Sequence, residues 1–276
     1  MRIAYLECFS GISGDMFLGA LLSAGIPEGV LQDATESLGL NASLTVETVI
    51  RSGIAATKVH VLEGGVLAEK VHSILHGHGQ HHEHTRQTHP DGHEHRHHAH
   101  GRSLSDIREL IQRARLHDDV KTFAINVFEL LGRSEAAIHN VPVEEIHFHE
   151  VGAVDAIVDI VAASAGIQYL QIDAWHSSPV NVGAGAVDCA HGRFPVPAPA
   201  AADLLRGFPT YSADVDEELT TPTGAALLRA LNPTFGKQPA MRVDSIGYGA
   251  GTRNPEAFPN VLRLRVGEAV EAPAFV

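Results

Sequence analysis

One internal segment of this chain cannot contribute to a folded core. From Gln80 to Gly101 the sequence contains no valine, isoleucine, leucine or aromatic residue, so the segment has no large apolar side chain to bury. Composition therefore predicts that residues 76–102 form a disordered insertion. The fold must then be built from the residues on either side of that insertion.

The same region holds most of the chain's histidines. Twelve of the 19 histidines lie here: His72, His76, His78, His81, His82, His84, His89, His93, His95, His97, His98 and His100. Neutral imidazole suits Ni, Cu, Zn and Co, and a mobile strand of imidazoles can wrap such an ion without a preformed cage. An affinity tag would be terminal and uninterrupted, whereas this tract is internal and broken by acidic residues and glycines; a pH-sensing or solvating loop is the other alternative. The tract predicts capture of a transition metal.

Composition limits the classes of function that remain. The chain has 276 residues, of which 44% are hydrophobic, and this is enough for a substantial core. A formal net charge of −13 argues against a nucleic-acid partner, which would require a basic surface. Cys8 and Cys189 lie far apart, so neither a disulfide framework nor a thiolate zinc site is indicated. The sequence shows neither a signal peptide nor a membrane-spanning run, and we expect a cytoplasmic protein.

The apolar periodicity alternates between helical and extended patterns. It predicts strands over 2–8, 44–50, 57–62, 175–182, 241–246 and 260–266, and helices over 15–24, 27–38, 103–116, 120–138, 151–165, 199–206 and 223–231. Such alternation is typical of α/β proteins. We expect a single α/β domain over 1–276, with a layered mixed sheet and flanking helices, interrupted by the histidine-rich insertion.

A glycine-bearing turn joins the first predicted strand to the first helix. Its serines and glycines are candidate phosphate ligands, because amide groups at a helix start attract anions: Ser10, Gly11, Ser13 and Gly14. Asp15 is either a helix cap or a ligand to a cation beside the phosphate. The turn lacks the Gly-Lys-Ser/Thr triplet of a P-loop, which excludes the GTP-driven nickel chaperones.

A second constellation combines histidines with carboxylates. His147 and His149 share one face of a predicted strand, and Glu150 follows them. Asp155 and Asp159 are four residues apart on the next helix and also share a face. Together these groups predict a metal site or an acid–base cluster. The alternative is that the acids balance the helix dipole and the histidines make ordinary hydrogen bonds.

Several further loops could bind an oxyanion. Each offers glycine amides, hydroxyl groups or a guanidinium group, and each signal alone is weak. The residues concerned are Gly183, Gly185, Arg193, Thr221, Thr223 and Arg253. Together they suit a phosphorylated small molecule.

These segments, in this order, resemble the N-terminal part of a known family. The motifs are FSGISGDM at 9–16, the histidine tract, IHFHEVGAVD at 146–155, LTTPTG at 219–224 and GYGAG at 247–251. The chain is similar over nearly its whole length to the nickel-pincer cofactor nickel insertases, the LarC family.

The resemblance implies insertion of nickel into pyridinium-3,5-bisthiocarboxylic acid mononucleotide, with one Ni–C and two Ni–S bonds. The product is the cofactor of lactate racemase and related enzymes, and the reaction of this cyclometallase, a lyase, uses CTP with Mg²⁺ or Mn²⁺. In the family a further C-terminal domain carries the CTP site, and this chain resembles the short product without it. Nickel binding therefore transfers to this chain, whereas full activity is expected to need that domain as a partner. The apo racemase is another expected partner, and we expect a homo-oligomer.

The chemistry of the reaction suggests a further role for the second constellation. Forming a metal–carbon bond requires removal of a proton from the carbon, and His147, His149 or Glu150 could accept it. Two other functions stay open: a nickel store or metallochaperone without catalytic activity, and a metal-dependent hydrolase centred on the two histidines with Asp155 and Asp159.

Overall fold

Helices and strands alternate along the chain. The computed structural model describes residues 1–68, 102–148, 152–189, 192–213, 215–255 and 258–271. The helices are α1 (Gly14–Ser23), α2 (Glu28–Ser37), α4 (Leu104–Arg113), α5 (Asp118–His139), the 3-10 turn η1 (Val143–Glu145), α6 (Val154–Leu170), α7 (Pro199–Leu204) and α8 (Pro222–Leu231). The strands are β1 (Arg2–Glu7), β2 (Ala42–Arg51), β3 (Ile54–Glu63), β4 (Val66–Leu67), β5 (Arg102–Ser103), β6 (His147–Phe148), β7 (Ala174–Ser177), β8 (Val180–Asn181), β9 (Ala186–Cys189), β10 (Gly192–Pro195), β11 (Thr210–Tyr211), β12 (Thr234–Phe235), β13 (Met241–Ala250) and β14 (Val261–Ala269).

The main sheet mixes parallel and antiparallel strands. Its order is β12-β7-β1-β14-β13-β3-β2, and β4 pairs with β3. β1 lies between β14, which is antiparallel to it, and β7, which is parallel to it. The first and last strands of the described chain are therefore neighbours at the centre of the sheet.

Helix α1 lies directly against the sheet. Its residues Met16 to Leu21 are buried, and the helix contacts β13, β3 and β14. A Cβ atom on Gly249 of β13 would come within 1.8 Å of the Met16 carbonyl oxygen, and one on Gly247 would come within 2.0 Å of the Ala20 carbonyl oxygen. The two glycines are therefore what allows the helix backbone to approach the strand so closely.

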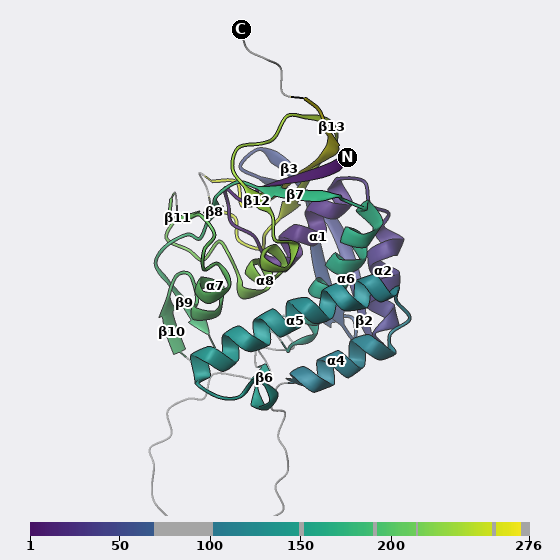
Figure 1. Ribbon diagram of the computed structural model, residues 1–276, viewed down its shortest axis with the longest axis vertical. Helices are drawn as coiled ribbons and strands as arrows, with labels where there is room; N and C mark the ends of the chain where they lie inside the picture. Colours follow the sequence, from purple (N-terminus) through teal and green to yellow (C-terminus); the bar gives the residue numbers. More distant parts are fainter. Residues whose placement is uncertain (69–101, 149–151, 190–191, 214, 256–257, 272–276) are drawn as a thin grey trace, which may run out of the picture.

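The remaining helices stack on the same side of the sheet. α6 packs against α1 and α2, and α5 packs against α6, α8, α4 and α7. In Figure 1 strands β3, β7 and β13 lie toward the top, with the helices below them. Helix α6 is apolar on almost all sides, as expected for a helix enclosed between other helices.

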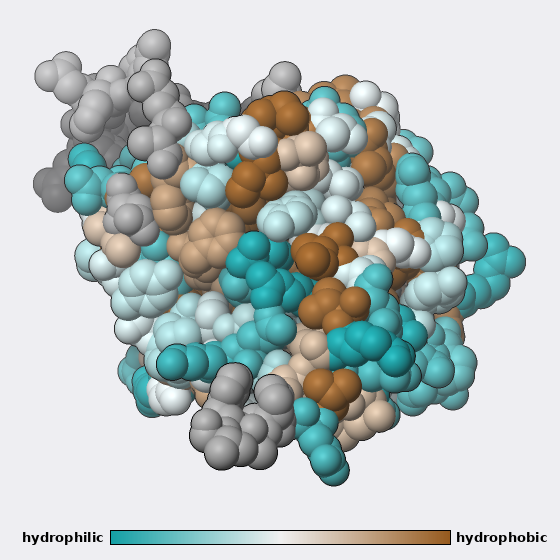
Figure 2. Space-filling view, turned by 90° about the horizontal axis from the view of Figure 1, so that it is seen from above, coloured by the Kyte–Doolittle hydropathy of each residue, from teal (hydrophilic) through white to brown (hydrophobic). Residues whose placement is uncertain are grey.

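The other face of the sheet carries polar groups. Glu7 of β1 is paired in register with Arg263 of β14, and Arg263 Nη2 donates a hydrogen bond to Glu7 Oε1 at 2.6 Å. This carboxylate raises the pKa of the Arg263 guanidinium group. Seen from above, apolar and polar patches alternate on the surface of the molecule (Figure 2).

The expected fold class, α/β with a layered mixed sheet and flanking helices, is confirmed. The strand expected over 175–182 is instead divided into β7 and β8, because Pro179 between them has no N–H to donate to a ladder. β7 belongs to the main sheet, and β8 pairs with β11. The expected histidine-rich insertion at 76–102 lies, except for residue 102, outside the described residues, and the single domain over 1–276 stays a prediction. Among the described residues, no helix has the length and apolar character needed to cross a membrane.

Candidate functional site

A cleft opens where strands β3 and β13 separate. The two strands are parallel and pair only at Thr57 and Gly249. Beyond this pair β3 continues to Glu63, whereas β13 ends at Ala250. The cleft beside them has a volume of about 460 Å³, and its lining includes residues 59–61 of β3 and residues 251–253 of the loop after β13.

The tertiary structure brings together eight of the residues that the sequence singled out. They are Ser13, Gly14, Asp15, Asp155, Asp159, Thr221, Thr223 and Arg253, and all of them line the cleft. They come from the starts of α1, α6 and α8 and from the loop after β13. Three helix N-termini therefore converge on one space, and their first-turn amide groups favour an anion there.

Acidic side chains outnumber basic ones in the lining. The carboxylates are those of Asp15, Glu135, Asp155, Asp159 and Glu218, and the lining also contains Arg253 and His60. Such an excess lowers the electrostatic potential inside a cleft and raises the local concentration of cations.

The N-termini of α1 and α8 are tied to each other. Ile12 N donates to the Leu219 carbonyl oxygen at 3.1 Å, and Thr221 N donates to the Ile12 carbonyl oxygen at 3.1 Å. A Cβ atom on Gly224 would come within 2.1 Å of the same Ile12 oxygen, so only glycine allows this approach. Thr221 Oγ1 accepts a hydrogen bond from Gly224 N and caps α8.

Helix α6 approaches the start of α1 just as closely. A Cβ atom on Gly14 would come within 2.3 Å of Asp159 Oδ2. Asp155 and Asp159 lie one helical turn apart and both line the cleft, as their spacing predicts. Gly14 therefore provides the room for the Asp159 carboxylate beside the N-terminus of α1.

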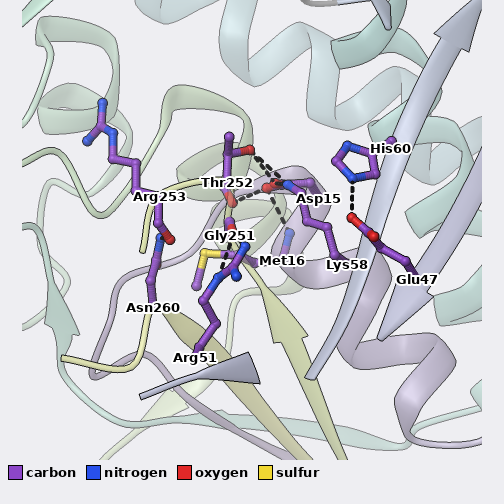
Figure 3. Close-up of polar contacts among 11 residues, drawn as sticks. Asp15, Met16, Glu47, Arg51, Lys58, His60, Gly251, Thr252, Arg253 and Asn260 are labelled. Atoms are coloured by element: carbon purple, nitrogen blue, oxygen red, sulfur yellow. Dashed lines mark hydrogen bonds and ion pairs between the residues drawn. The ribbon is translucent and has the colours of Figure 1, made fainter. Parts of the chain in front are cut away.

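A buried ion pair lies beside the cleft, and its lysine is not among the residues predicted from the sequence. Lys58 of β3, only 2% exposed, donates to Asp15 Oδ2 and also donates to Thr252 Oγ1 at 2.8 Å (Figure 3). The other Asp15 oxygen, Oδ1, accepts from Ser13 Oγ and from Met16 N. Asp15 thus links the first turn of α1 to β3 and to the loop after β13.

Strand alternation was the signal that could have revealed Lys58. In the segment Thr57 to Val61, lysine and histidine alternate with valine, so Lys58 and His60 share one face of the strand. His60 also lines the cleft, and its Nε2 lies 2.9 Å from Glu47 Oε1 on the neighbouring strand β2 (Figure 3). Neither His60 nor Glu47 was predicted from the sequence as a site residue.

Arg253 lies at the rim of the cleft. Its Nη1 donates to the Glu218 carbonyl oxygen at 2.7 Å, and its Nε lies 3.7 Å from Glu217 Oε2. Asn260 Nδ2 donates to the Arg253 carbonyl oxygen at 3.0 Å. The exposed guanidinium group is therefore held near the start of α8 by backbone and side-chain contacts.

Four other predicted phosphate ligands lie outside this lining and make structural contacts. Ser10 is buried, and its Oγ donates to the Pro259 carbonyl oxygen at 2.5 Å. Gly11, Gly183 and Gly185 have positive φ angles of 72°, 80° and 81°. Cβ atoms on these three would come within 2.1, 1.8 and 3.0 Å of the backbone oxygens of residues 219, 217 and 216, respectively. The three glycines allow close backbone packing between loops.

Two further predicted residues lie on exposed strands. Arg193 is exposed on β10, in the hairpin that β10 forms with β9, and it is not part of the lining. His147 is exposed on β6, which pairs with β5 at Ser103, and it is also absent from the lining.

The remaining predicted residues belong to the histidine tract and to the segment directly after β6. The twelve tract histidines, His149 and Glu150 all lie outside the described residues. Within the described part of the chain, no three His, Cys, Asp or Glu side chains are grouped closely enough to hold a metal ion. A cation bound in the cleft would therefore need further donor atoms, in addition to those of the described side chains.

Cys8, just after the end of β1, is not available as a thiolate ligand. It is fully buried, and burial raises its pKa to about 12. Its Sγ lies 3.7 Å from Ser177 Oγ in a hydrogen bond. The side chain therefore stays a neutral thiol at physiological pH.

Known proteins match nearly the whole chain. Residues 4–274 match the family model described as "Nickel insertion protein". A pyridinium-3,5-bisthiocarboxylic acid mononucleotide nickel insertion protein of Geobacillus kaustophilus is 44% identical over 269 residues, which are 97% of this chain and 60% of the relative. A protein of the same name from Desulfitobacterium hafniense is 45% identical over 98% of this chain and 60% of the relative. A putative nickel insertion protein of Geobacter metallireducens is 43% identical, over 98% of this chain and 62% of the relative.

The chain thus spans about 60% of the length of these curated relatives. No solved structure matches it. The family model covers residues on both sides of the cleft, from the start of α1 to the loop after β13. Over this extent and at these identities, the chain belongs to the nickel insertion protein family.

Proposed function

We propose that the protein takes part in inserting nickel into pyridinium-3,5-bisthiocarboxylic acid mononucleotide, to form the nickel-pincer cofactor of lactate racemase-type enzymes. The proposal depends above all on the convergence of three helix N-termini and five carboxylates on one cleft, in a chain of the nickel insertion protein family. A mononucleotide brings a phosphate group and nickel brings positive charge. The cleft offers amide and hydroxyl donors for the phosphate group and carboxylate oxygens for the nickel ion.

The phosphate is expected to bind at the paired N-termini of α1 and α8. Thr221 and Thr223 carry hydroxyl groups there, and the first-turn amides of both helices lie beside them. Ser13 lines the same side of the cleft, and the Arg253 guanidinium group at the rim adds a positive charge. Binding of the phosphate here would orient the rest of the mononucleotide into the cleft.

The cation is expected to enter on the acidic side of the cleft. Asp155 and Asp159 lie on one face of α6, and Asp15 at the start of α1 lines the same cleft. Carboxylates in a cleft attract a divalent ion before it is transferred. Leu67, which is only partly buried in the same lining, offers an apolar surface to the pyridinium ring of the substrate.

The histidine tract is proposed to collect the nickel. Its predicted role rests on composition. Before the tract the described chain ends at Ala68, and the preceding residue, Leu67, lines the cleft. After the tract, Arg102 Nη1 donates to the Gly152 carbonyl oxygen at 2.7 Å, two residues before α6 begins. The described segment that precedes the tract therefore ends at the cleft, and this supports a role of the tract in supplying metal to it.

Removal of the ring proton is proposed for His147, His149 or Glu150. His147 lies on β6 outside the cleft lining, whereas the chain after it leads through positions 149 and 150 to α6 and its cleft-lining Asp155. This connection supports His149 and Glu150 more than His147. Replacing all three residues with alanine is expected to abolish insertion while nickel binding stays unchanged. Unchanged insertion by this variant would exclude the role.

Complete activity is proposed to need the portion of the relatives that this chain does not span. CTP, with Mg²⁺ or Mn²⁺, is expected to act there, and the class of reaction would be that of a lyase. That domain and the apo racemase are the proposed protein partners, and assembly as a homo-oligomer stays a prediction.

One comparison tests the proposal. Nickel content and CTP-dependent metallation of the pincer precursor are measured for this chain and for a version extended to the full length of the relatives. We expect both to bind nickel and the extended version to form the metallated product. If the extended version forms no product, the insertase function is wrong.

Deletion of residues 80–101 distinguishes insertion from storage. A store would lose most of its metal capacity and have no other activity, whereas an insertase supplied with excess nickel should keep forming product. The described cleft favours insertion, because a store has no need of a site for a phosphorylated ligand. Hydrolysis of a simple phosphoester or amide by the purified chain would instead support the hydrolase alternative.

A further inference from the structure

We propose that His60 is the protein's own nickel ligand in the cleft, and that Glu47 fixes the orientation of its imidazole ring. His60 would hold the ion while the thiocarboxylate sulfurs of the mononucleotide close around it. This inference rests on the proposed function and assigns a residue that neither the sequence motifs nor the family match identifies.

The geometry around His60 is that of an oriented imidazole. His60 Nε2 lies 2.9 Å from Glu47 Oε1, and the two side chains come from the antiparallel strands β3 and β2. In Figure 3 the bonded nitrogen faces Glu47 and the other ring nitrogen faces away from it. That second nitrogen, Nδ1, makes no hydrogen bond within the described part of the chain.

This pattern is the one that metal-binding histidines share. A histidine that binds a metal through one nitrogen almost always donates the N–H of its other nitrogen to a carboxylate or carbonyl oxygen. The bond to Glu47 would hold the proton on Nε2 and leave the lone pair on Nδ1 for the ion. His60 is the only histidine among the described residues that line the cleft.

The carboxylate of Asp15 is less suited than the His60 imidazole to be the protein's nickel ligand. Both oxygens of Asp15 already accept hydrogen bonds, Oδ2 from Lys58 and Thr252, and Oδ1 from Ser13 and Met16 N. A metal ion at Asp15 would have to displace the buried Lys58 ammonium group, which is costly. His60 carries no such competing charge.

One protein ligand is enough if the substrate supplies the others. Thiocarboxylates at ring positions 3 and 5 flank position 4 and can give two sulfur donors to one ion. Nickel(II) commonly takes four donors in a plane, so an imidazole can occupy a position that the substrate leaves open. This explains why the described residues contain no group of three ligands and yet the cleft suits a nickel transfer.

The test measures metallation of the pincer precursor by the full-length protein with saturating nickel and CTP. His60→Gly and His60→Gln are expected to lower the initial rate by about 100-fold, and Glu47→Gln by about 10-fold, the range found for residues that orient metal ligands. His117→Asn is the matched control, because His117 is an exposed histidine outside the cleft lining and asparagine keeps its helix cap.

Imidazole in solution provides a readout that a merely structural role would not affect. Imidazole is expected to raise the rate of His60→Gly at least tenfold and to leave the wild type and Glu47→Gln unchanged. An active wild type together with a His60→Gly rate within threefold of it would overturn the inference, and so would a loss that imidazole does not rescue. A wild-type protein that forms no product would overturn the proposed function itself.

Discussion

Replacing Gly249 with alanine tests the close contact between helix α1 and strand β13. A Cβ atom on Gly249 would lie 1.8 Å from the Met16 carbonyl oxygen and 2.4 Å from Ala20 N. An ordinary contact begins at 3.4 Å, so the helix would have to move by about 1.6 Å (3.4 minus 1.8). Both opposing atoms belong to the backbone and cannot rotate away.

The expected cost follows from this displacement. Overpacking a core by one methyl group typically costs about 1–3 kcal/mol, and a clash with helix backbone should reach the upper end, about 3 kcal/mol. For a chain of this size each kcal/mol lowers the melting temperature by about 2–4 °C, so a decrease of about 6–12 °C is expected. Because α1 also carries Asp15 and begins directly after Ser13, the cleft should be disturbed as well.

Denaturant and thermal unfolding of the Gly249→Ala and wild-type chains would measure the effect. Gly29→Ala is the matched control, because this glycine lies in α2 and a Cβ atom added to it would meet no other atom within 4 Å. Alanine there should be neutral or stabilise the helix by up to about 1 kcal/mol. If Gly249→Ala is as stable as Gly29→Ala, the reasoning about backbone contact is refuted.

Three further predictions concern single side chains. Thr221→Ala removes the cap bond to Gly224 N and should cost about 1 kcal/mol in thermal unfolding, whereas Thr221→Ser should stay close to wild type; equal losses would argue against the cap. Iodoacetamide should modify the partly exposed Cys189 before the buried Cys8, whose pKa is raised to about 12, and early labelling of Cys8 by mass spectrometry would contradict this. Burial lowers the pKa of His176 below its ordinary 6.5, so the unfolded chain takes up this proton first and stability should fall as pH drops below 6.5. His176→Gln should reduce that fall in denaturant titrations at pH 7.5 and 5.5, and an identical pH dependence would exclude the contribution.

Local sequence patterns predicted much of the fold and part of the site. The helix predicted over 151–165, which the structure places at Val154–Leu170, and the four-residue spacing of Asp155 and Asp159 determined that both carboxylates share a face. The glycine-bearing turn before α1 and the Thr-Pro start of α8 were also recognisable as helix N-termini. These features depend on neighbours within a few residues, and local backbone geometry alone decides them.

Other glycine-rich loops have the sequence features of anion-binding loops, but in the structure their glycines pack against backbone. Gly183 and Gly185 resemble anion-binding loops in composition, yet each lies against the backbone of the segment 216–217. Gly249 belongs to a similar motif and lies beneath α1. A glycine that faces a ligand and a glycine that faces another part of the chain carry the same local signal.

The sequence by itself determined the order of the main helices and of the long strands, the acidic and hydroxyl groups at the helix starts and the imidazole-rich composition of the tract. Only the tertiary structure decided that the starts of α1, α6 and α8 meet, that His60 lines the same cleft and that Lys58 pairs with Asp15 beside it. The physical reason is that strand order and register join residues about 200 positions apart, as Thr57 pairs with Gly249. No local period in the chain encodes such a pairing; burial of α1 against the whole sheet selects it.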